Sequence, residues 1–267
     1  MKPTTLILRS AGTNCDAETA HAFALAGSHM QFVHINRLLE NPALLDQFQL
    51  MAIPGGFSYG DDIAAGKILA NQIVHHLRDP MRRFIDAAKP IIGICNGFQV
   101  LVKTDLIPGP LAGRTGQTAT LTNNDCGRYL DRWVHLASRS SKCIWTAGVG
   151  LIELPVAHGE GKFIPADPLV RQALWDHHQV ALVYAKSDGS PAAGQFPENP
   201  NGSVDDIAGV CDATGLVLGL MPHPERHVDP TQHFAWTSRR NASAEGDGLQ
   251  FFRNAMNHVK DAVGAGV

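Results

Sequence analysis

Cys95 lies at the centre of the sequence Gly-Ile-Cys-Asn-Gly, residues 93–97. An apolar run over 91–94 precedes it and an amphipathic stretch over 98–103 follows, which predicts a sharp turn between a strand and a helix. Glycine permits close backbone approach beside such a turn, and a helix N-terminus favours the thiolate form of cysteine. A lone cysteine is more often a small buried side chain; the glycine frame weakens that interpretation, and both stay open at this point.

A cysteine nucleophile needs a base, and the base needs a group that orients it. Thirteen histidines are present, so residue type alone selects none of them. His223 differs from the others because it follows an apolar run over 216–221 and lies between two prolines. Glu225 can accept a hydrogen bond from one ring nitrogen of His223, which leaves the other nitrogen for the thiol. An isolated His-Pro-Glu is more often a surface loop, so both interpretations stay open at this point.

A glycine-rich loop follows a third apolar run. Leu50–Ile53 reads as a buried strand, and Pro-Gly-Gly comes directly after it at 54–56. Backbone N–H groups stabilise the oxyanion of a tetrahedral intermediate, and glycine presents them without obstruction. Gly56 and Asn96, the residue after the cysteine, are the natural pair of donors. The alternative is a tight turn without a chemical role.

Metal and nucleotide sites are disfavoured by residue spacing. His223 and His227 are four residues apart, but a proline interrupts any regular helix between them, and no Pro-Cys-x-x-Cys occurs. The run Gly60–Ile68 has five residues between its glycines and an isoleucine where a P-loop needs Ser or Thr. No Gly-x-Gly-x-x-Gly is present either. We therefore expect neither a metal ion nor ATP or NAD on this chain.

Bulk composition excludes several classes of protein. The 267 residues are 44% hydrophobic and 18% charged, with a net charge of −3. These values are ordinary for a globular protein and do not indicate a nucleic-acid or membrane-surface partner. No apolar stretch reaches bilayer length, and no signal sequence is recognisable. The five cysteines are scattered, which favours a reducing, cytoplasmic location over a disulfide framework.

The first hundred residues alternate predicted strands and helices, which predicts a parallel sheet covered on both faces. The strands are expected over 4–8, 30–35, 50–53 and 91–94. The helices are expected over 16–26 (capped by Asp16), from 42, over 65–77 and over 79–88. Further on, strands with hairpin-type links are expected over 119–122, 132–137, 151–157, 180–185, 207–211 and 216–221, and helices over 168–175 and 248–263. Residues 228–248 are predicted to be irregular. No linker or repeat divides the chain, so we expect a single domain over 1–267.

Taken in order, these motifs resemble the class I glutamine amidotransferase family. Each motif is weak alone, but the ordered set is specific. Longer matches are similar to the branch that supplies ammonia for purine biosynthesis: PGGFSYGD (54–61), GICNGFQ (93–99), AHGEG (157–161), PNGS (200–203) with IAG (207–209), and LGLMPHPER (218–226). The resemblance implies an α/β fold with a flavodoxin-like open sheet, mostly parallel, and helices on both faces.

The resemblance also implies a role for each site residue. Cys95 would be the nucleophile, His223 the base and Glu225 its orienting carboxylate. The thiolate would attack the side-chain amide of L-glutamine, ammonia would leave, and water would hydrolyse the glutamyl thioester. The implied oxyanion hole is Gly56 with Asn96, and the implied substrate-binding residues are Gln99 and Phe57.

Partners follow from the same resemblance. Ammonia would pass to a separate synthetase subunit that uses ATP and Mg and converts formylglycinamide ribonucleotide to the amidine, with a small accessory subunit in the complex. This chain would then need no cofactor. Two positions depart from the family pattern, because Ala64 replaces a common Arg and Asp131 a common Cys. Two alternatives stay open: a cysteine peptidase or γ-glutamyl hydrolase of the same fold, and a non-catalytic scaffold.

Overall fold

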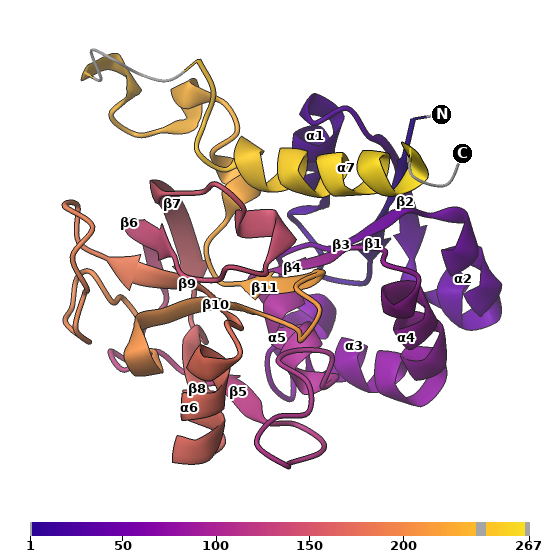
Figure 1. The fold of residues 1–267 in the computed structure, drawn as a ribbon, viewed down its shortest axis with the longest axis horizontal. Coiled ribbons are helices and arrows are strands. Elements are labelled where there is room, and N and C mark those ends of the chain that lie inside the picture. Colours follow the sequence, from indigo (N-terminus) through magenta and orange to yellow (C-terminus); the bar gives the residue numbers. More distant parts are fainter. Residues whose placement is uncertain (1, 239–243, 265–267) are drawn as a thin grey trace.

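A computed structural model of the chain describes residues 2–238 and 244–264. Its centre is a nine-stranded sheet in the order β2-β1-β3-β4-β11-β10-β9-β6-β7, and a second sheet pairs β5 with β8 (Figure 1). The strands are β1 (Thr4–Arg9), β2 (His29–His34), β3 (Leu50–Ile53), β4 (Ile91–Ile94), β5 (Ala119–Thr122), β6 (Leu130–Ser138), β7 (Leu151–His158), β8 (Lys162–Pro165), β9 (Val180–Ala185), β10 (Ile207–Cys211) and β11 (Val217–Leu220).

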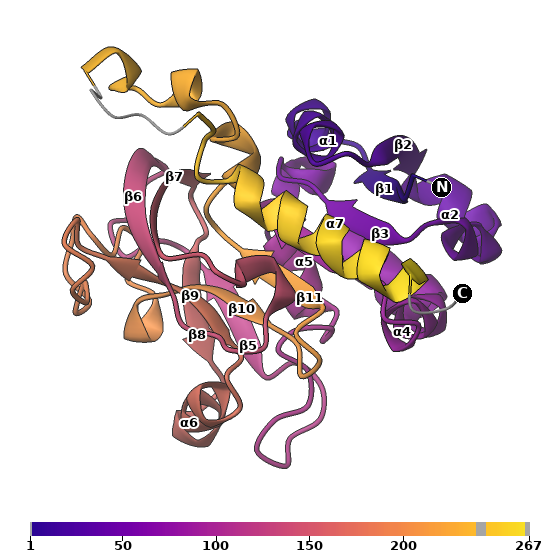
Figure 2. The same ribbon diagram turned by 45° about the horizontal axis from the view of Figure 1, so that its top comes forward.

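One half of the large sheet is parallel and covered on both faces. β2, β1, β3, β4 and β11 run parallel in a flavodoxin-like order. Every residue of β3, β4 and β11 is buried, because α7 crosses one face and α5 lies against the other (Figure 2). The predicted α/β fold is confirmed.

The helices are α1 (Asp16–Leu25), α2 (Ile35–Glu40), α3 (Lys67–Gln72), α4 (Arg78–Asp86), α5 (Asn96–Lys103), α6 (Pro168–Asp176) and α7 (Leu249–Gly264).

The other half of the sheet is antiparallel. β10, β9, β6 and β7 continue from β11 through antiparallel pairs. The predicted hairpin between β10 and β11 is present, with Cys211 opposite Leu218. Because β10 pairs with β11 and β9 pairs with β10, this half supports the strand that precedes His223.

Several local predictions were wrong at element boundaries. Cys15 is the N-cap of α1, whereas Asp16 lies inside the helix and pairs with Arg9 at 2.7 Å. The predicted break at Asp79 is absent, because α3 runs through a π-helical turn over 73–77 directly into α4. That wider turn tolerates the missing N–H of Pro80. Two elements were not predicted at all: α2, which starts where β2 ends, and β8, which follows the glycine loop.

The closing helix α7 packs by its apolar stripe, as predicted. Leu249, Phe252, Met256 and Val259 are all buried. The Phe252 ring meets Phe23 of α1 edge-on, with centroids 4.9 Å apart. The irregular segment before α7 contains 3-10 turns over 230–232 and 236–238, and its residues 239–243 lie outside the described part. None of the described helices has the length and apolar character needed to cross a membrane.

Candidate active site

Three parallel strands bring the predicted site residues to one edge of the sheet. β3, β4 and β11 are neighbours, with Gly93 opposite Gly219 in the β4–β11 register. The carboxyl ends of parallel strands meet at the same edge. Gly55 and Gly56 follow β3, Cys95 follows β4, and His223 lies three residues after β11. The backbone N–H of Cys95 also donates to the Leu220 carbonyl of β11 at 2.8 Å.

The turn at Cys95 has the strained geometry of a nucleophile elbow. Its backbone angles are φ 52° and ψ −104°, in a region that non-glycine residues rarely adopt. The two glycines that flank the turn, Gly93 and Gly97, are required because a side chain would not fit at either position. A Cβ at Gly97 would lie 1.9 Å from the Ile53 carbonyl oxygen, and one at Gly93 would lie 2.6 Å from the Gly97 carbonyl oxygen. The sequence therefore presents the thiol at the start of α5 at the cost of a strained residue.

His223 is oriented by Glu225 in a buried pair. The Nδ1 atom of His223 donates to Oε1 of Glu225 at 2.6 Å, and the two residues are 1% and 0% exposed. The backbone N–H of His223 donates to the Pro155 carbonyl of β7 at 2.9 Å, which fixes the turn from a second strand. With Nδ1 engaged, Nε2 is buried and has no hydrogen-bond partner within the described chain. This is the tautomer that can accept a proton from a thiol.

The electrostatics of His223 favour its charged form. Burial by itself lowers the pKa of the imidazole, but the negative charges of Glu225 and of a Cys95 thiolate outweigh burial and hold that pKa well above its ordinary value. A protonated imidazole next to an ionised thiol is the arrangement that activates cysteine nucleophiles. The pair is therefore suited to acyl transfer.

Gly55 is the point at which the reactive side chains meet. A Cβ on Gly55 would lie 3.0 Å from Cε1 of His223, 3.5 Å from Cβ of Cys95 and 3.0 Å from Sγ of Cys15. The structure thus brings Cys95 and His223 together and places the thiol of Cys15 beside them. Cys15 was not predicted as a site residue. Its position after β1, at the same edge of the sheet, is the signal that could have found it.

The two residues predicted to form the oxyanion hole lie beside the thiol. Asn96 is the first residue of α5, so its backbone N–H has no acceptor within the helix. Its side chain is held by the Ser58 N–H and by Asp61, at 3.1 Å each. Gly56 has φ +142°, and a Cβ there would lie 2.5 Å from the Gly12 carbonyl oxygen, so only glycine fits.

A cavity of about 240 Å³ opens beside Cys95. It is smaller than a drug-sized site and suits a small ligand. The predicted residues Gly56, Phe57, Cys95 and Gln99 all line it. Within it, the Gln99 amide donates to the Glu160 carbonyl at 2.6 Å and accepts from Asn96 at 2.9 Å. Its further lining residues are Asp61, Ala65, Tyr129, Ala157, His158, Gly159 and Glu160.

His158 is a buried histidine in this cavity that sequence reasoning did not single out. Its Nδ1 atom pairs with Oδ1 of Asn124 at 3.1 Å. Burial, with a contribution from the His223 charge, lowers the pKa of His158 to about 3. His158 is therefore neutral at physiological pH and does not compete with His223 for a proton.

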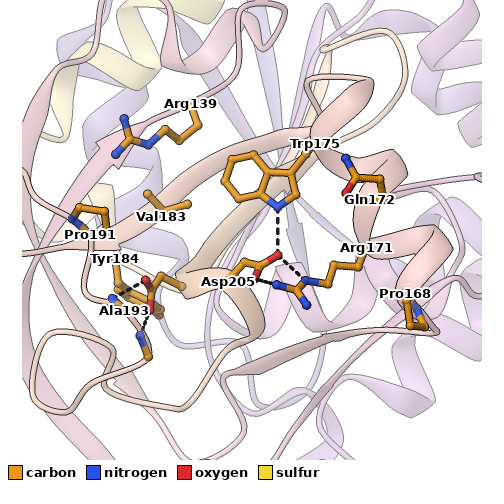
Figure 3. Close-up of a pocket in the computed structure, with 12 residues that line it drawn as sticks. Arg139, Pro168, Arg171, Gln172, Trp175, Val183, Tyr184, Pro191, Ala193 and Asp205 are labelled. Carbon is orange, nitrogen blue, oxygen red and sulfur yellow. Dashed lines mark hydrogen bonds and ion pairs between the residues drawn. The ribbon is translucent and has the colours of Figure 1, made fainter.

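A larger cavity of about 900 Å³ lies beside α6 and β9 (Figure 3). There Arg171 and Trp175 both donate to the Asp205 carboxylate, from Nε at 2.7 Å and from Nε1 at 3.0 Å. No cysteine or histidine occurs among its described lining residues. Without a nucleophile and a base, it cannot perform the chemistry that the smaller cavity supports.

Comparisons to known proteins agree with the fold. The chain belongs to the CobB/CobQ-like glutamine amidotransferase family, whose pattern matches residues 2–259. Within that family it is similar to the phosphoribosylformylglycinamidine synthase subunit PurQ of Dehalococcoides mccartyi, with 47% identity over 97% of this chain and 98% of the relative. PurQ of Methanococcus maripaludis is 40% identical over 98% and 96% of the two chains. The resemblance predicted from the motifs is confirmed.

A solved structure gives the same result. The structure of PurLQS from Thermotoga maritima contains a chain with a TM-score of 0.71 and 29% identity, over 96% of this chain and 99% of that one. A glutamine amidotransferase of the same organism, at 14% identity and a TM-score of 0.54, shares the fold.

Proposed function

We propose that this chain is the glutaminase subunit of a phosphoribosylformylglycinamidine synthase. It hydrolyses glutamine to glutamate and ammonia, and the ammonia serves a synthetase subunit that converts formylglycinamide ribonucleotide to the amidine. Relatives with the PurQ name match over nearly their whole length, which supports this assignment. The observation that carries it is the meeting of Cys95 with the buried His223–Glu225 pair at one edge of the sheet.

The first half of the reaction forms a covalent intermediate. The reaction starts from the ion pair in which Nε2 of His223 already holds the proton of Cys95, while Glu225 accepts from Nδ1–H and stabilises the imidazolium. The thiolate attacks the side-chain carbonyl carbon of glutamine. The resulting oxyanion accepts hydrogen bonds from the Gly56 and Asn96 backbone N–H groups. His223 then donates its proton to the leaving amine, and ammonia departs from a glutamyl thioester.

The second half of the reaction regenerates the thiol. Water is deprotonated by Nε2 of His223 and attacks the thioester carbonyl, again with the oxyanion at Gly56 and Asn96. The thiolate of Cys95 leaves, glutamate is released, and the proton returns to the thiol. Gln99 and Phe57, on the cavity wall, are proposed to contact the glutamine and exclude bulkier amides.

The partners belong to the same proposal. The synthetase subunit would bind ATP and Mg, and a small accessory subunit would complete the complex. The structural neighbour is part of a PurLQS assembly, which supports both partners. This chain would need no cofactor for thioester chemistry. A cytoplasmic location, which the scattered cysteines favour, stays a prediction.

Reconstitution of the complex tests the assignment. Cys95→Ala should lower glutamine-dependent amidine formation by more than about a thousandfold, because it removes the proposed nucleophile. Ammonia-dependent synthesis should be retained, since it needs only the synthetase. The exposed Cys126, changed to Ser, is the matched control and should leave both activities intact. Loss of both activities in Cys95→Ala, or of neither, would contradict the proposal.

A further inference from the structure

The cavity beside Cys95 contains a buried histidine nitrogen whose hydrogen-bonding capacity is unused. His158 lines this cavity and is only 2% exposed. Its Nε2 atom has no hydrogen-bond partner among the residues that the structure describes. A buried polar atom without a partner costs free energy, so a ligand that supplies the partner is favoured.

The surroundings of His158 determine which of its ring nitrogens carries the proton. The side-chain amide nitrogen of Asn124 donates to the carbonyl oxygens of Arg128 and His158, at 2.9 Å each, so its Oδ1 atom faces the imidazole. This oxygen accepts from the Gly161 N–H at 3.0 Å and lies 3.1 Å from Nδ1 of His158. Because an amide oxygen only accepts, Nδ1 holds the proton and Nε2 is a bare acceptor. Nε2 therefore requires a ligand that donates a hydrogen bond.

The acidic residues of the cavity wall indicate the charge of that ligand. Glu160 and Asp61 line the cavity, and no lysine or arginine of the described chain does so. Oδ1 of Asp61 already accepts from the Gly66 N–H and from the Asn96 side chain, at 3.1 Å each. The Glu160 carboxylate accepts a single hydrogen bond within the described chain, from the Ala65 N–H to Oε2 at 3.4 Å. A carboxylate with a spare oxygen, in the same cavity as a bare imidazole nitrogen, favours a cationic donor.

Glutamine carries a group of this kind. Its amide end must lie at Cys95 for the proposed attack, which leaves the α-ammonium group at its other end for the rest of the cavity. The geometry points to His158 and Glu160 as the residues that recognise this ammonium group, with Nε2 of His158 and the Glu160 carboxylate each accepting one of its N–H groups. This inference rests on the proposed function. It makes the two residues determinants of substrate specificity, since they bind the end of glutamine that does not react.

The test compares two substrates that differ only in this group. L-Glutamine and glutaramate, which has hydrogen in place of the α-ammonium, are assayed by ammonia release from the full chain in complex with the synthetase. The parent should prefer glutamine by at least about a hundredfold in kcat/KM, because a site that hydrogen-bonds an N–H group rejects an analogue that lacks it.

Two variants each remove one acceptor. His158→Asn keeps an amide donor near the Nδ1 position but has no equivalent of Nε2, and Glu160→Gln removes the negative charge while keeping the shape. Each should lower kcat/KM for glutamine at least about tenfold and leave that for glutaramate nearly unchanged, so the preference shrinks by the same factor. Asp62→Asn, the same loss of charge on an exposed residue outside the cavity lining, is the matched control and should keep the parental preference.

Binding to a chain without the nucleophile gives a second readout that needs no turnover. In Cys95→Ala, titration calorimetry should show tighter binding of glutamine than of glutaramate. Adding Glu160→Gln should weaken the binding of glutamine at least about tenfold and that of glutaramate little. Since Glu160 is only half-buried, this variant keeps the inference testable if His158→Asn does not fold.

The contrary outcomes are specific. An unchanged preference for glutamine in both variants would overturn the inference. An equal loss of activity toward the two substrates would also overturn it, because it would indicate a structural role or a contact with the amide end. The proposed function fails differently, through absence of glutamine hydrolysis by the parent complex. Hydrolysis of glutamine with the parental preference in both variants would leave that function in place and overturn this inference alone.

Discussion

The residue that organises the catalytic centre has no side chain. Gly55 leaves the space in which Cys95, Cys15 and His223 approach one another, and its missing Cβ would lie 3.0 Å from the imidazole. The position does not need a left-handed backbone, since its φ is not in that region. Its requirement for glycine is therefore one of space, and a methyl group is a clean probe of the distance between thiol and base.

Gly55→Ala is predicted to lower kcat by about 10²-fold, because displacement of a catalytic group by about 1 Å costs that much. The substrate contacts proposed for Gln99 and Phe57 would be untouched, so KM should change little. Steady-state kinetics of glutamine hydrolysis provide the measurement. Gly150→Ala is the control, since a Cβ there meets nothing within 4 Å. Equal kcat values for the two variants would contradict the packing argument.

His158 gives the protein an acid-sensitive stability. Its pKa is lowered from 6.5 to about 3 in the folded state. Between these two pH values, His158 binds a proton in the unfolded chain but not in the folded chain. Above the pKa of the unfolded state, His158 is neutral in both states and has no such effect on stability. As the pH falls below that pKa, protonation of His158 in the unfolded chain destabilises the fold. It is worth at most about 1.4 kcal/mol per pH unit.

Replacement of His158 by Gln tests this contribution. The free energy of unfolding should fall less steeply from pH 7 to pH 4 in His158→Gln than in the parent, as measured by urea denaturation at each pH. Parallel pH profiles for the two proteins would show that His158 is not the group that titrates.

At the residue level, the predicted site residues are those whose local sequence indicates chemistry. The glycines around Cys95 and the prolines around His223 are visible along the chain, and each motif follows an apolar strand. Cys15 was not singled out although it too follows a predicted strand, and His158 was not singled out although it lies in the AHGEG motif. They reach the site through the pairing of strands far apart in sequence, which periodicity does not reveal.

At the scale of elements, parallel pairing determines where the chemistry is located. β3, β4 and β11 end at one edge of the sheet, so the three loops that follow them meet there although they are far apart in the sequence. Strong apolar runs made these strands predictable. β8 was missed because it directly follows the glycine-bearing loop over 158–161, and α2 because it follows β2 with no intervening loop.

The helix α7 contributes stability through its packing against α1. Phe252 is fully buried against Phe23. Phe252→Ala should lower the free energy of unfolding by about 3–5 kcal/mol, because it leaves a cavity in the core. Exposed Lys260, changed to Ala, should stay within about 0.5 kcal/mol of the parent. Chemical denaturation measures both, and a small effect of Phe252→Ala would contradict the packing of α7.

At the scale of the whole molecule, the site opens onto a partly apolar rim. Phe57 and Tyr129 line the cavity, are 45% and 53% exposed, and lie with their ring centroids 6.4 Å apart. A partner could cover this rim and order the site. The prediction of one domain over 1–267 stays a prediction, and the continuous nine-stranded sheet supports it.

The isolated chain is predicted to hydrolyse glutamine slowly and to accelerate when the synthetase subunit is added, because binding of the partner would complete the site. Glutamate release with and without the synthetase is the measurement, and heat-treated synthetase is the control. Full activity of the chain alone would contradict this expectation.

The central claim is that Cys95 attacks the amide carbon of glutamine. An electrophilic glutamine analogue should add once per chain, and peptide mass spectrometry of the labelled complex should place the adduct on Cys95. Glutamine-dependent synthesis should be lost in proportion to labelling, while ammonia-dependent synthesis persists. An adduct on another cysteine, or full labelling of Cys95 with glutamine-dependent activity intact, would contradict the account.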